Sequence, residues 1–177
     1  NQKTLPLKES MILKPLSPYA LQKFTGEKFA KVFSALYGLP VISLRYFNVY
    51  GPRIDFRSDY SLVIGKFLRL QREGKPLTIF GDGKQTRAFC YVDDAVEASI
   101  RAMTSRKLKG GEVINVGGSE VHLVESVAKL IGGEVTYLPP RQGDVRHTSS
   151  SMALARKLLG WKPKVSFEKG IEKTKEW

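Results

Sequence analysis

Apolar and polar residues follow two different periods along this chain, which predicts helices and strands in turn. From residue 18 to residue 37 the apolar positions recur every three or four residues, Ser17 can cap the start, and Gly38 can end the segment. We therefore predict a helix over 18–37, with a broad buried stripe made of Leu21, Phe24, Phe29, Val32, Phe33 and Leu36. The next run, PVISLRYF (40–47), is mostly apolar and predicts a strand.

The rest of the chain continues this alternation. After a polar loop, a helix is expected near 59–73, followed by two short strands, LTIF (77–80) and TRAFCYV (86–92), joined by the glycine-rich turn GDGK. Asp93 or Asp94 can cap the helix DAVEASIRAM. The remaining segments predict strands at 112–117 and 134–138 and helices at 122–132, 150–160 and 167–177. Such alternation indicates an α/β fold, in which ligands gather beyond the carboxyl ends of strands.

Composition excludes several classes of protein. The 177 residues are 42% hydrophobic and 26% charged, which is typical of a globular chain with a sizeable core. One cysteine, Cys90, excludes an intramolecular disulfide framework, and His122 and His147 are too far apart to form a helical metal pair. We expect a reducing, cytoplasmic setting and no metal site.

The net charge of +12 favours anionic partners. Lysines and arginines are nevertheless scattered along the whole chain, without a polybasic tract or a nucleic-acid-binding motif, so no nucleic-acid partner is predicted. No apolar run approaches the roughly 20 residues that cross a bilayer. The N-terminal segment also lacks the features of a signal peptide, so we expect a soluble protein without a membrane partner.

Two loops carry candidate chemistry. The loop after residue 47 places Asn48, Tyr50 and Arg53 beside a Gly-Pro pair, where a functional loop and a plain turn are equally compatible with the spacing. In GDGKQTR (81–87), the glycines allow close backbone approach and Arg87 could clamp a phosphate, although a hairpin turn with a surface arginine explains the same residues.

A third loop, RQGDVR, flanks the carboxylate of Asp144 with Arg141 and Arg146. A cation for phosphate and a carboxylate for sugar hydroxyls would suit a nucleotide, but exposed loops often contain such mixtures.

Tyr19 and Lys23 lie one helical turn apart, so both could reach one ligand. With seven tyrosines and 18 lysines in 177 residues, about 0.7 pairs of this spacing are expected by chance. The pair alone is therefore weak evidence for catalysis.

The order of these motifs is far more specific than any one of them. PLSPYALQKFTGEKF, GLPVISLRYFNVYGPR, IFGDGKQTRAFCYVDDAVEA, INVGG, RQGDV and LLGWKP follow one another over nearly the whole chain. This series closely resembles the C-terminal half of the extended short-chain dehydrogenase/reductase family, and within it the UDP-glucose or UDP-N-acetylglucosamine 4-epimerases.

The resemblance implies NAD as cofactor, a UDP-sugar substrate and a transient oxidation at sugar C4. Tyr19 would be the catalytic acid-base, and Lys23 would favour its phenolate and bind the nicotinamide ribose. Tyr46 and Phe47 would line the nicotinamide side. The substrate-binding residues would be Asn48, Arg87 and Arg141 at the diphosphate, Asp144 at the ribose and Phe80 near the uracil. In the family the tyrosine-bearing helix also contributes to a dimer interface, so a homo-oligomer is expected.

The resemblance also implies a division of the chain. Residues 1–53 would belong to a Rossmann-like cofactor domain, 54–92 to the substrate domain, 93–118 to the cofactor sheet again, and 119–177 to a small α/β substrate-binding domain. None of the 16 glycines forms the family's Gly-x-x-Gly-x-x-Gly loop, which holds the cofactor pyrophosphate. The serine or threonine expected before the catalytic tyrosine is also absent. We therefore expect a C-terminal segment that is catalytically silent by itself.

Smaller departures from the family pattern are Ala88, where an acidic residue is usual, and the serines at 149–151, where an aspartate is common. Two alternatives remain open. One is a nucleotide-sugar 4,6-dehydratase or decarboxylase of the same superfamily, and the other is a non-catalytic nucleotide-sugar-binding or structural remnant.

Overall fold

A computed structural model describes residues 4–56, 63–141 and 143–177. The helices within these ranges are α1 (Pro18–Tyr37), α2 (Val63–Arg72), α3 (Val92–Thr104), α4 (Val124–Ile131), α5 (Ala153–Leu159) and α6 (Phe167–Glu176). The strands are β1 (Ser43–Tyr46), β2 (Val49–Tyr50), β3 (Leu77–Phe80), β4 (Thr86–Ala88), β5 (Cys90–Tyr91), β6 (Val113–Val116), β7 (Val121–Leu123), β8 (Val135–Leu138) and β9 (His147–Thr148). The predicted helix near 59–73 is confirmed from residue 63, and its first four residues lie outside the described ranges.

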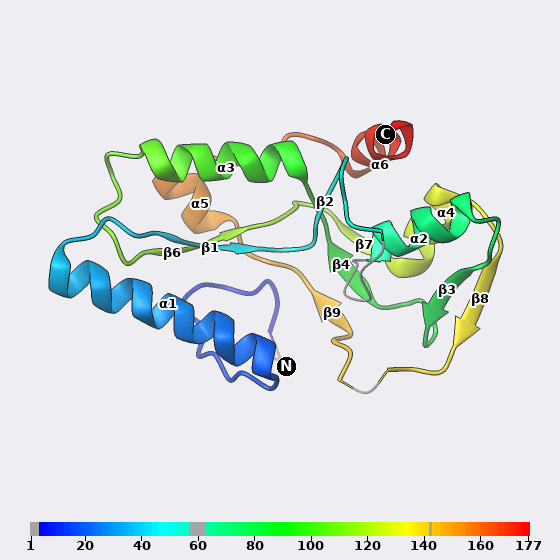
Figure 1. The fold of residues 1–177 in the computed structure, drawn as a ribbon, viewed down its shortest axis with the longest axis horizontal. Helices are drawn as coiled ribbons and strands as arrows, with labels where there is room; N and C mark the ends of the chain where they lie inside the picture. The colour runs from blue at the N-terminus through cyan, green and yellow to red at the C-terminus, as the bar shows by residue number, and fades with distance from the viewer. Residues whose placement is uncertain (1–3, 57–62, 142) are drawn as a thin grey trace.

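The strands pair mostly in parallel, which confirms the predicted α/β class. β1 pairs with β6, β2 with β5 and β3 with β8, all in parallel. In the three-stranded sheet, the central β4 is antiparallel to β7 and parallel to β9. Figure 1 shows an elongated molecule with α1, α3, α5, β1 and β6 at one end and α2, α4, β3 and β8 at the other.

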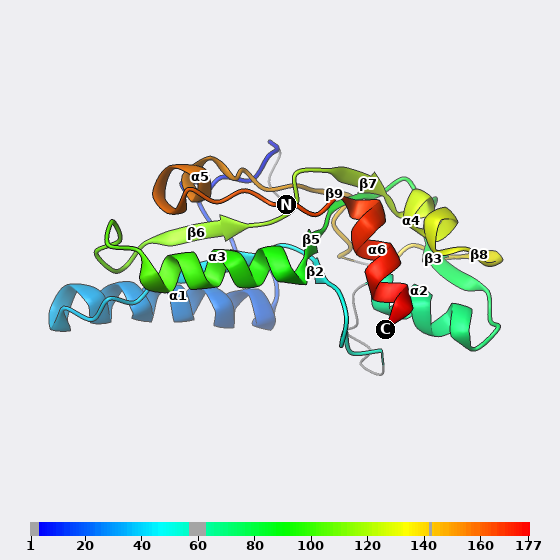
Figure 2. The same ribbon diagram turned by 90° about the horizontal axis from the view of Figure 1, so that it is seen from above.

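Each end of the molecule has its own buried core. One core is built mainly by α2, β3, α4 and the start of α6, around the buried rings of Tyr50, Phe67 and Phe167. The other lies between α3, β6 and α5 around Trp161, which is 1% exposed. Figure 2 shows α5 on the side of β6 away from α1, and α6 between the two ends.

Helix α1 has the predicted ends but not the predicted environment. Ser17 accepts a bond from the Ala20 amide at 3.1 Å, and Gly38 ends the helix in the left-handed conformation. The expected burial of the apolar stripe is wrong, because no residue of α1 is buried and Phe29, for example, is 60% exposed. The partly buried positions are Ala20, Phe24, Glu27, Ala30 and Ser34. The narrow face that β1 contacts therefore carries mostly small or polar residues, and most of the apolar stripe lies off it.

The two strands around GDGK do not form a hairpin. β3 pairs with β8 and β4 pairs with β7 and β9, so the turn leads from one sheet into another. The predicted strand 86–92 also divides at Phe89 into β4 and β5, and residue 92 already belongs to α3. Pairing with distant segments decides these arrangements, and local sequence does not encode it.

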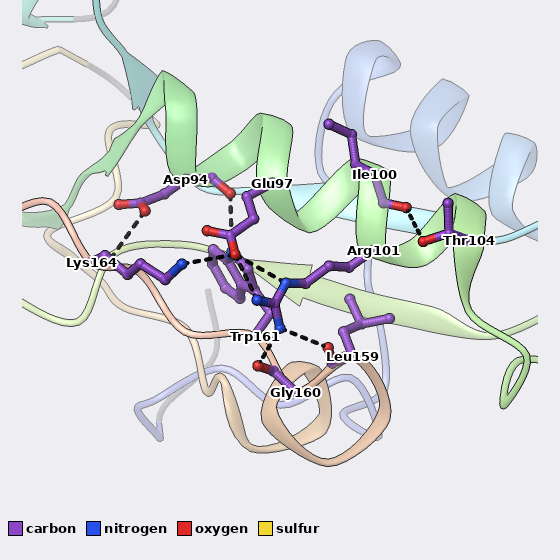
Figure 3. A network of polar contacts seen from close by, with 9 residues as sticks. All are labelled: Asp94, Glu97, Ile100, Arg101, Thr104, Leu159, Gly160, Trp161 and Lys164. Atoms are coloured by element: carbon purple, nitrogen blue, oxygen red, sulfur yellow. Dashed lines mark hydrogen bonds and ion pairs between the residues drawn. The ribbon is translucent and has the colours of Figure 1, made fainter.

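The predicted capping of α3 by an aspartate is wrong as well. Tyr91 is the N-cap residue and makes no side-chain cap bond. The carboxylate of Asp94 instead accepts bonds from the backbone amides of Lys164 and Val165 at 3.1 and 3.0 Å. Figure 3 shows this network, in which Glu97 also binds Arg101 and the Lys164 ammonium. The network ties the segment before α6 to α3.

Among the described residues, no helix combines the length and apolar character needed to span a bilayer. The same residues contain no group of three or more side chains suited to hold a metal ion.

Candidate active site

The four residues predicted for catalysis and cofactor binding line one groove of about 830 Å³ between α1, the segment before it and β1. Tyr19 and Lys23 come from the first two turns of α1, and Tyr46 and Phe47 from the end of β1. The Lys23 ammonium lies 5.5 Å from the centroid of the Tyr19 ring, and Tyr19 is 70% exposed. A phenol and an ammonium thus face the same open space.

One further pair in this groove was missed by the sequence analysis. The guanidinium of Arg45 on β1 donates two bonds of 2.7 Å to the carboxylate of Glu27, which lies one turn after Lys23. Both side chains are less than one fifth exposed. The spacing of Tyr19, Lys23 and Glu27, each four residues apart, places all three on one face of α1 and could have indicated this partner. The bidentate pair fixes the rotation of α1 relative to β1.

Tyr46 points away from that pair. Successive side chains of a strand face opposite sides, so Arg45 faces α1 and Tyr46 faces α3. The Tyr46 hydroxyl lies 2.7 Å from the Ser99 hydroxyl of α3, which in turn donates to the Ala95 carbonyl. Tyr46 and Phe47 were both predicted at the nicotinamide. The Tyr46 side chain faces α3, and Phe47 lies on the α1 side.

All five predicted substrate residues line a second pocket of about 210 Å³, namely Asn48, Phe80, Arg87, Arg141 and Asp144. They come from the turn after β1, from β3, from β4 and from the loop between β8 and β9. Phe47 lines the first groove and Asn48 the second pocket, so both spaces reach the carboxyl end of β1. This is where the carboxyl ends of parallel strands place ligands.

Asn48 is held in a conformation that suits asparagine better than most residues. Its φ is 44°, in the left-handed region, where asparagine is several-fold enriched. The side-chain amide donates one bond of 2.8 Å to the Ala88 carbonyl and has a second N–H donor. Asn48 therefore couples the end of β1 to β4 while facing the pocket.

Arg87 is part-buried on β4, so the alternative of a surface arginine in a hairpin turn is wrong. Its guanidinium donates to the carbonyls of Thr86 and Arg146 at 2.9 and 3.2 Å. Burial lowers the pKa of the Arg87 guanidinium, and nearby Asp144 opposes this shift. Arginine remains charged in proteins, so the pocket holds an oriented cation.

Phe80 is the aromatic wall of the pocket. β3 alternates, with Leu77 and Ile79 in the core and Phe80 facing the pocket. The Arg141 guanidinium lies 3.7 Å from the ring centroid and the Lys66 ammonium 4.7 Å from it. Lys66 projects from α2 and was not singled out from the sequence, because a lysine on an amphipathic helix gives no distinctive signal.

Other residues of the candidate loops have different roles. Tyr50 is 2% exposed, and its hydroxyl donates to the Phe167 carbonyl in the core. Arg146 makes a two-bond ion pair with Asp82 of the GDGK turn, at 2.7 and 3.1 Å. This pair ties the turn to the loop that carries Arg141 and Asp144.

Comparison with known families gives an assignment for this chain. Residues 1–117 match the NAD dependent epimerase/dehydratase family. The chain belongs to this family. It is 38% identical to the UDP-glucose 4-epimerase of Mycolicibacterium smegmatis, over 97% of this chain and 56% of that protein.

Solved structures agree with this assignment. The UDP-glucose 4-epimerase of Thermotoga maritima with UDP-glucose has a TM-score of 0.92 at 38% identity, over 99% of this chain and 58% of that one. The UDP-glucuronic acid 4-epimerase of Bacillus cereus, in complex with UDP-glucuronic acid and NAD, has a TM-score of 0.91 at 32% identity, over 99% and 57%. The fold is therefore that of the C-terminal portion of an epimerase of this family.

This member of the NAD dependent epimerase/dehydratase family spans a little over half the length of such relatives. Relatives of similar identity include a UDP-N-acetyl-alpha-D-glucosaminuronate decarboxylase of Bacillus cytotoxicus and a dTDP-glucose 4,6-dehydratase of Xanthomonas campestris, at 36% and 32%.

Proposed function

We propose that this chain carries the UDP-sugar site and the acid-base pair of an NAD-dependent nucleotide-sugar 4-epimerase. The observation that supports this most strongly is that the nine predicted residues line two spaces, both of which reach the carboxyl end of β1. Tyr19, Lys23 and Phe47 line the groove together with Tyr46, whose hydroxyl is turned toward Ser99 of α3, and the five substrate residues line the pocket. The division into segments 1–53, 54–92, 93–118 and 119–177 and a cytoplasmic location also stay predictions.

The residues beside the groove fit the nicotinamide end of the cofactor. Tyr19, Lys23 and Phe47 would hold that end, because they offer a phenol, an ammonium and an apolar ring to one open space. Reversible hydride transfer at sugar C4 is the chemistry that NAD would supply there. Tyr19 would hold the proton of the sugar 4-hydroxyl at its phenolic oxygen, and the Lys23 ammonium would favour the phenolate.

The pocket would hold the nucleotide. Arg87 and Arg141 would bind the diphosphate with charge-assisted bonds, and Asn48 would donate its second amide N–H to it. Asp144 would accept bonds from the ribose hydroxyls, and the Phe80 ring would contact the uracil. With the nucleotide fixed there, the hexose would extend past the end of β1 into the groove beside Tyr19.

Calorimetric titration of the chain with UDP tests this assignment. We expect saturable binding that Arg87→Ala weakens at least about tenfold, since a bond between charged groups contributes roughly 1.5–3 kcal/mol. Arg156→Ala is the matched control, because Arg156 is exposed on α5 away from the pocket. Absence of UDP binding, or equal affinity of both variants, would contradict the proposal.

Activity is a separate question. We predict that the 177-residue chain by itself does not interconvert UDP-galactose and UDP-glucose with added NAD+, because the glycine-rich pyrophosphate loop of the family is not in its sequence. Chromatographic detection of turnover by the pure chain would overturn this prediction.

Decarboxylase and dehydratase relatives favour a second candidate reaction on the same site. Both would use the same tyrosine and lysine and would differ in the sugar product. Product analysis with UDP-glucose and UDP-glucuronate, using a full-length protein that contains this chain, separates the three reactions. Binding without turnover there would instead favour a nucleotide-sugar-binding protein.

We also propose that the exposed face of α1 is covered by a second copy of the protein. Leu21, Phe29, Val32 and Leu36 are each at least half exposed along this helix. Exposed apolar residues at helical spacing are typical of an interaction surface. Light scattering should give twice the mass of one chain, and a monomer at millimolar concentration would contradict this.

A further inference from the structure

Lys66 enters the nucleotide pocket from a different element than the two arginines predicted there. Arg87 comes from β4, Arg141 from the loop between β8 and β9, and Lys66 from α2. Three cations from three separate parts of the chain thus converge on a space of about 210 Å³. Only the tertiary structure can bring cations from such distant segments together. Neighbouring lysines on one surface helix would be close without it.

The charge of this pocket is not balanced by its own residues. Asp144 is the one carboxylate among its described lining residues, against Lys66, Arg87 and Arg141. No ion pair joins these three cations to any carboxylate in residues 4–56, 63–141 and 143–177. An anionic ligand with two negative charges would match the excess of two positive charges.

Lys66 and Arg141 also share one aromatic ring. Their charged groups lie 4.7 and 3.7 Å from the centroid of Phe80. Burial, followed by the charges of Arg141 and Arg69, lowers the pKa of the Lys66 ammonium. The two cations therefore repel each other while the ring attracts both, and a phosphate between them would relieve the repulsion.

We propose that Lys66 is a third diphosphate ligand, which binds the nucleotide together with Arg87 and Arg141. This proposal rests on the function proposed above and adds a ligand to that site. Phosphate would draw the ammonium and the Arg141 guanidinium from the face of Phe80, because a charged bond is stronger than an exposed cation-π contact. The same step would free the ring for the nucleobase, so phosphate binding and base binding are coupled.

Titration calorimetry with two ligands, UDP and uridine, tests this role. Lys66→Met keeps the length of the side chain and removes the charge, and we expect it to weaken UDP at least about tenfold. Uridine has no phosphate, so its affinity should change less than about twofold. Lys66→Arg should keep UDP binding within about threefold of the unmodified chain, because the cation is retained.

The matched control is Lys129→Met on α4, which removes the same charge from an exposed position that does not line the pocket. UDP binding by Lys66→Met equal to that of Lys129→Met would overturn the proposal. Equal losses for UDP and uridine would also overturn it, because they would show that Lys66 only packs on Phe80.

These outcomes separate the two proposals. If UDP binds and Arg87→Ala weakens it while Lys66→Met does not, the role of Lys66 is wrong and the proposed function stands. If the unmodified chain binds no UDP, both are wrong. Far-UV circular dichroism of each variant identifies any loss of binding that comes from unfolding.

Discussion

The two ends of the molecule hold a helix beside a strand by different kinds of contact. α2 presents Ile64, Phe67 and Leu68 to a core, where each is at most 1% exposed. α1 is twice as long and has no buried residue, and Glu27 gives it a two-bond ion pair to Arg45 of β1. The proposed nucleotide pocket thus lies on an element that the chain buries by itself, and the proposed acid-base pair on one that it leaves exposed.

This difference indicates what each site needs. Packing against an apolar core holds α2 and β3, so the pocket that they line is expected to form within the chain. α1 carries most of its apolar residues outward, and the ion pair of Glu27 with Arg45 joins it to β1. We therefore expect the proposed nucleotide binding and the positioning of Tyr19 to be separable.

The largest expected difference is in the free energy of unfolding, when a phenylalanine is replaced by alanine at each end of the molecule. Phe67→Ala in the core of α2 should lower the free energy of unfolding by about 3–5 kcal/mol, because it leaves a cavity. Phe29→Ala on α1 should lower it by less than about 0.5 kcal/mol at dilutions where the chain is monomeric, because the ring is 60% exposed in the single chain. Urea unfolding followed by tryptophan fluorescence measures both, and equal losses would contradict the comparison.

The contact between α3 and the C-terminal segment should have the next largest effect. Asp94→Ala leaves the amides of Lys164 and Val165 without their carboxylate and should cost about 2–3 kcal/mol. Asp94→Asn keeps an acceptor oxygen and should cost less. Unfolding in urea ranks the two variants, and a larger loss for asparagine than for alanine would exclude the proposed role of the acceptor.

A smaller and local effect is expected at Glu27. Glu27→Gln removes the charge that pairs with Arg45, and amide hydrogen exchange in α1 should accelerate about tenfold, which corresponds to roughly 1.4 kcal/mol of local stability. Exchange in α2 and α4 should not change. Glu172→Gln on the exposed face of α6 is the control, and unchanged exchange in α1 would show that other contacts hold the helix.

The last prediction is that the thiol of Cys90 hardly reacts with thiol reagents in the folded chain. Burial, with a lesser contribution from Asp94, raises the pKa of its thiol to about 12. At pH 8 about one thiol in ten thousand would then be ionised, and the side chain is fully buried. A thiol reagent such as 5,5′-dithiobis(2-nitrobenzoate) should label the unfolded chain rapidly and the folded chain at least about a hundredfold more slowly. Rapid labelling of the folded chain would show that the α3 core opens easily.

Local signals in the sequence were sufficient to predict many helices and strands. The ends of α1 follow from Ser17 and Gly38, and LTIF became β3 with the predicted bounds. The order of the motifs, rather than any single motif, was sufficient to recognise the family. Lys66 and Arg45 were missed because neither carries a local pattern that distinguishes it from a surface cation or a strand residue.

The sequence by itself determined the α/β class, the ends of α1 and the family, because capping, apolar period and motif order are local or linear properties. Only the tertiary structure decided that β3 pairs with β8, that Asp94 binds distant amides, and that most of the apolar stripe of α1 is exposed. It also placed Lys66, Arg87 and Arg141 around one pocket. Each of these depends on segments far apart in the chain, and contacts between such segments are set by the packing of the whole molecule.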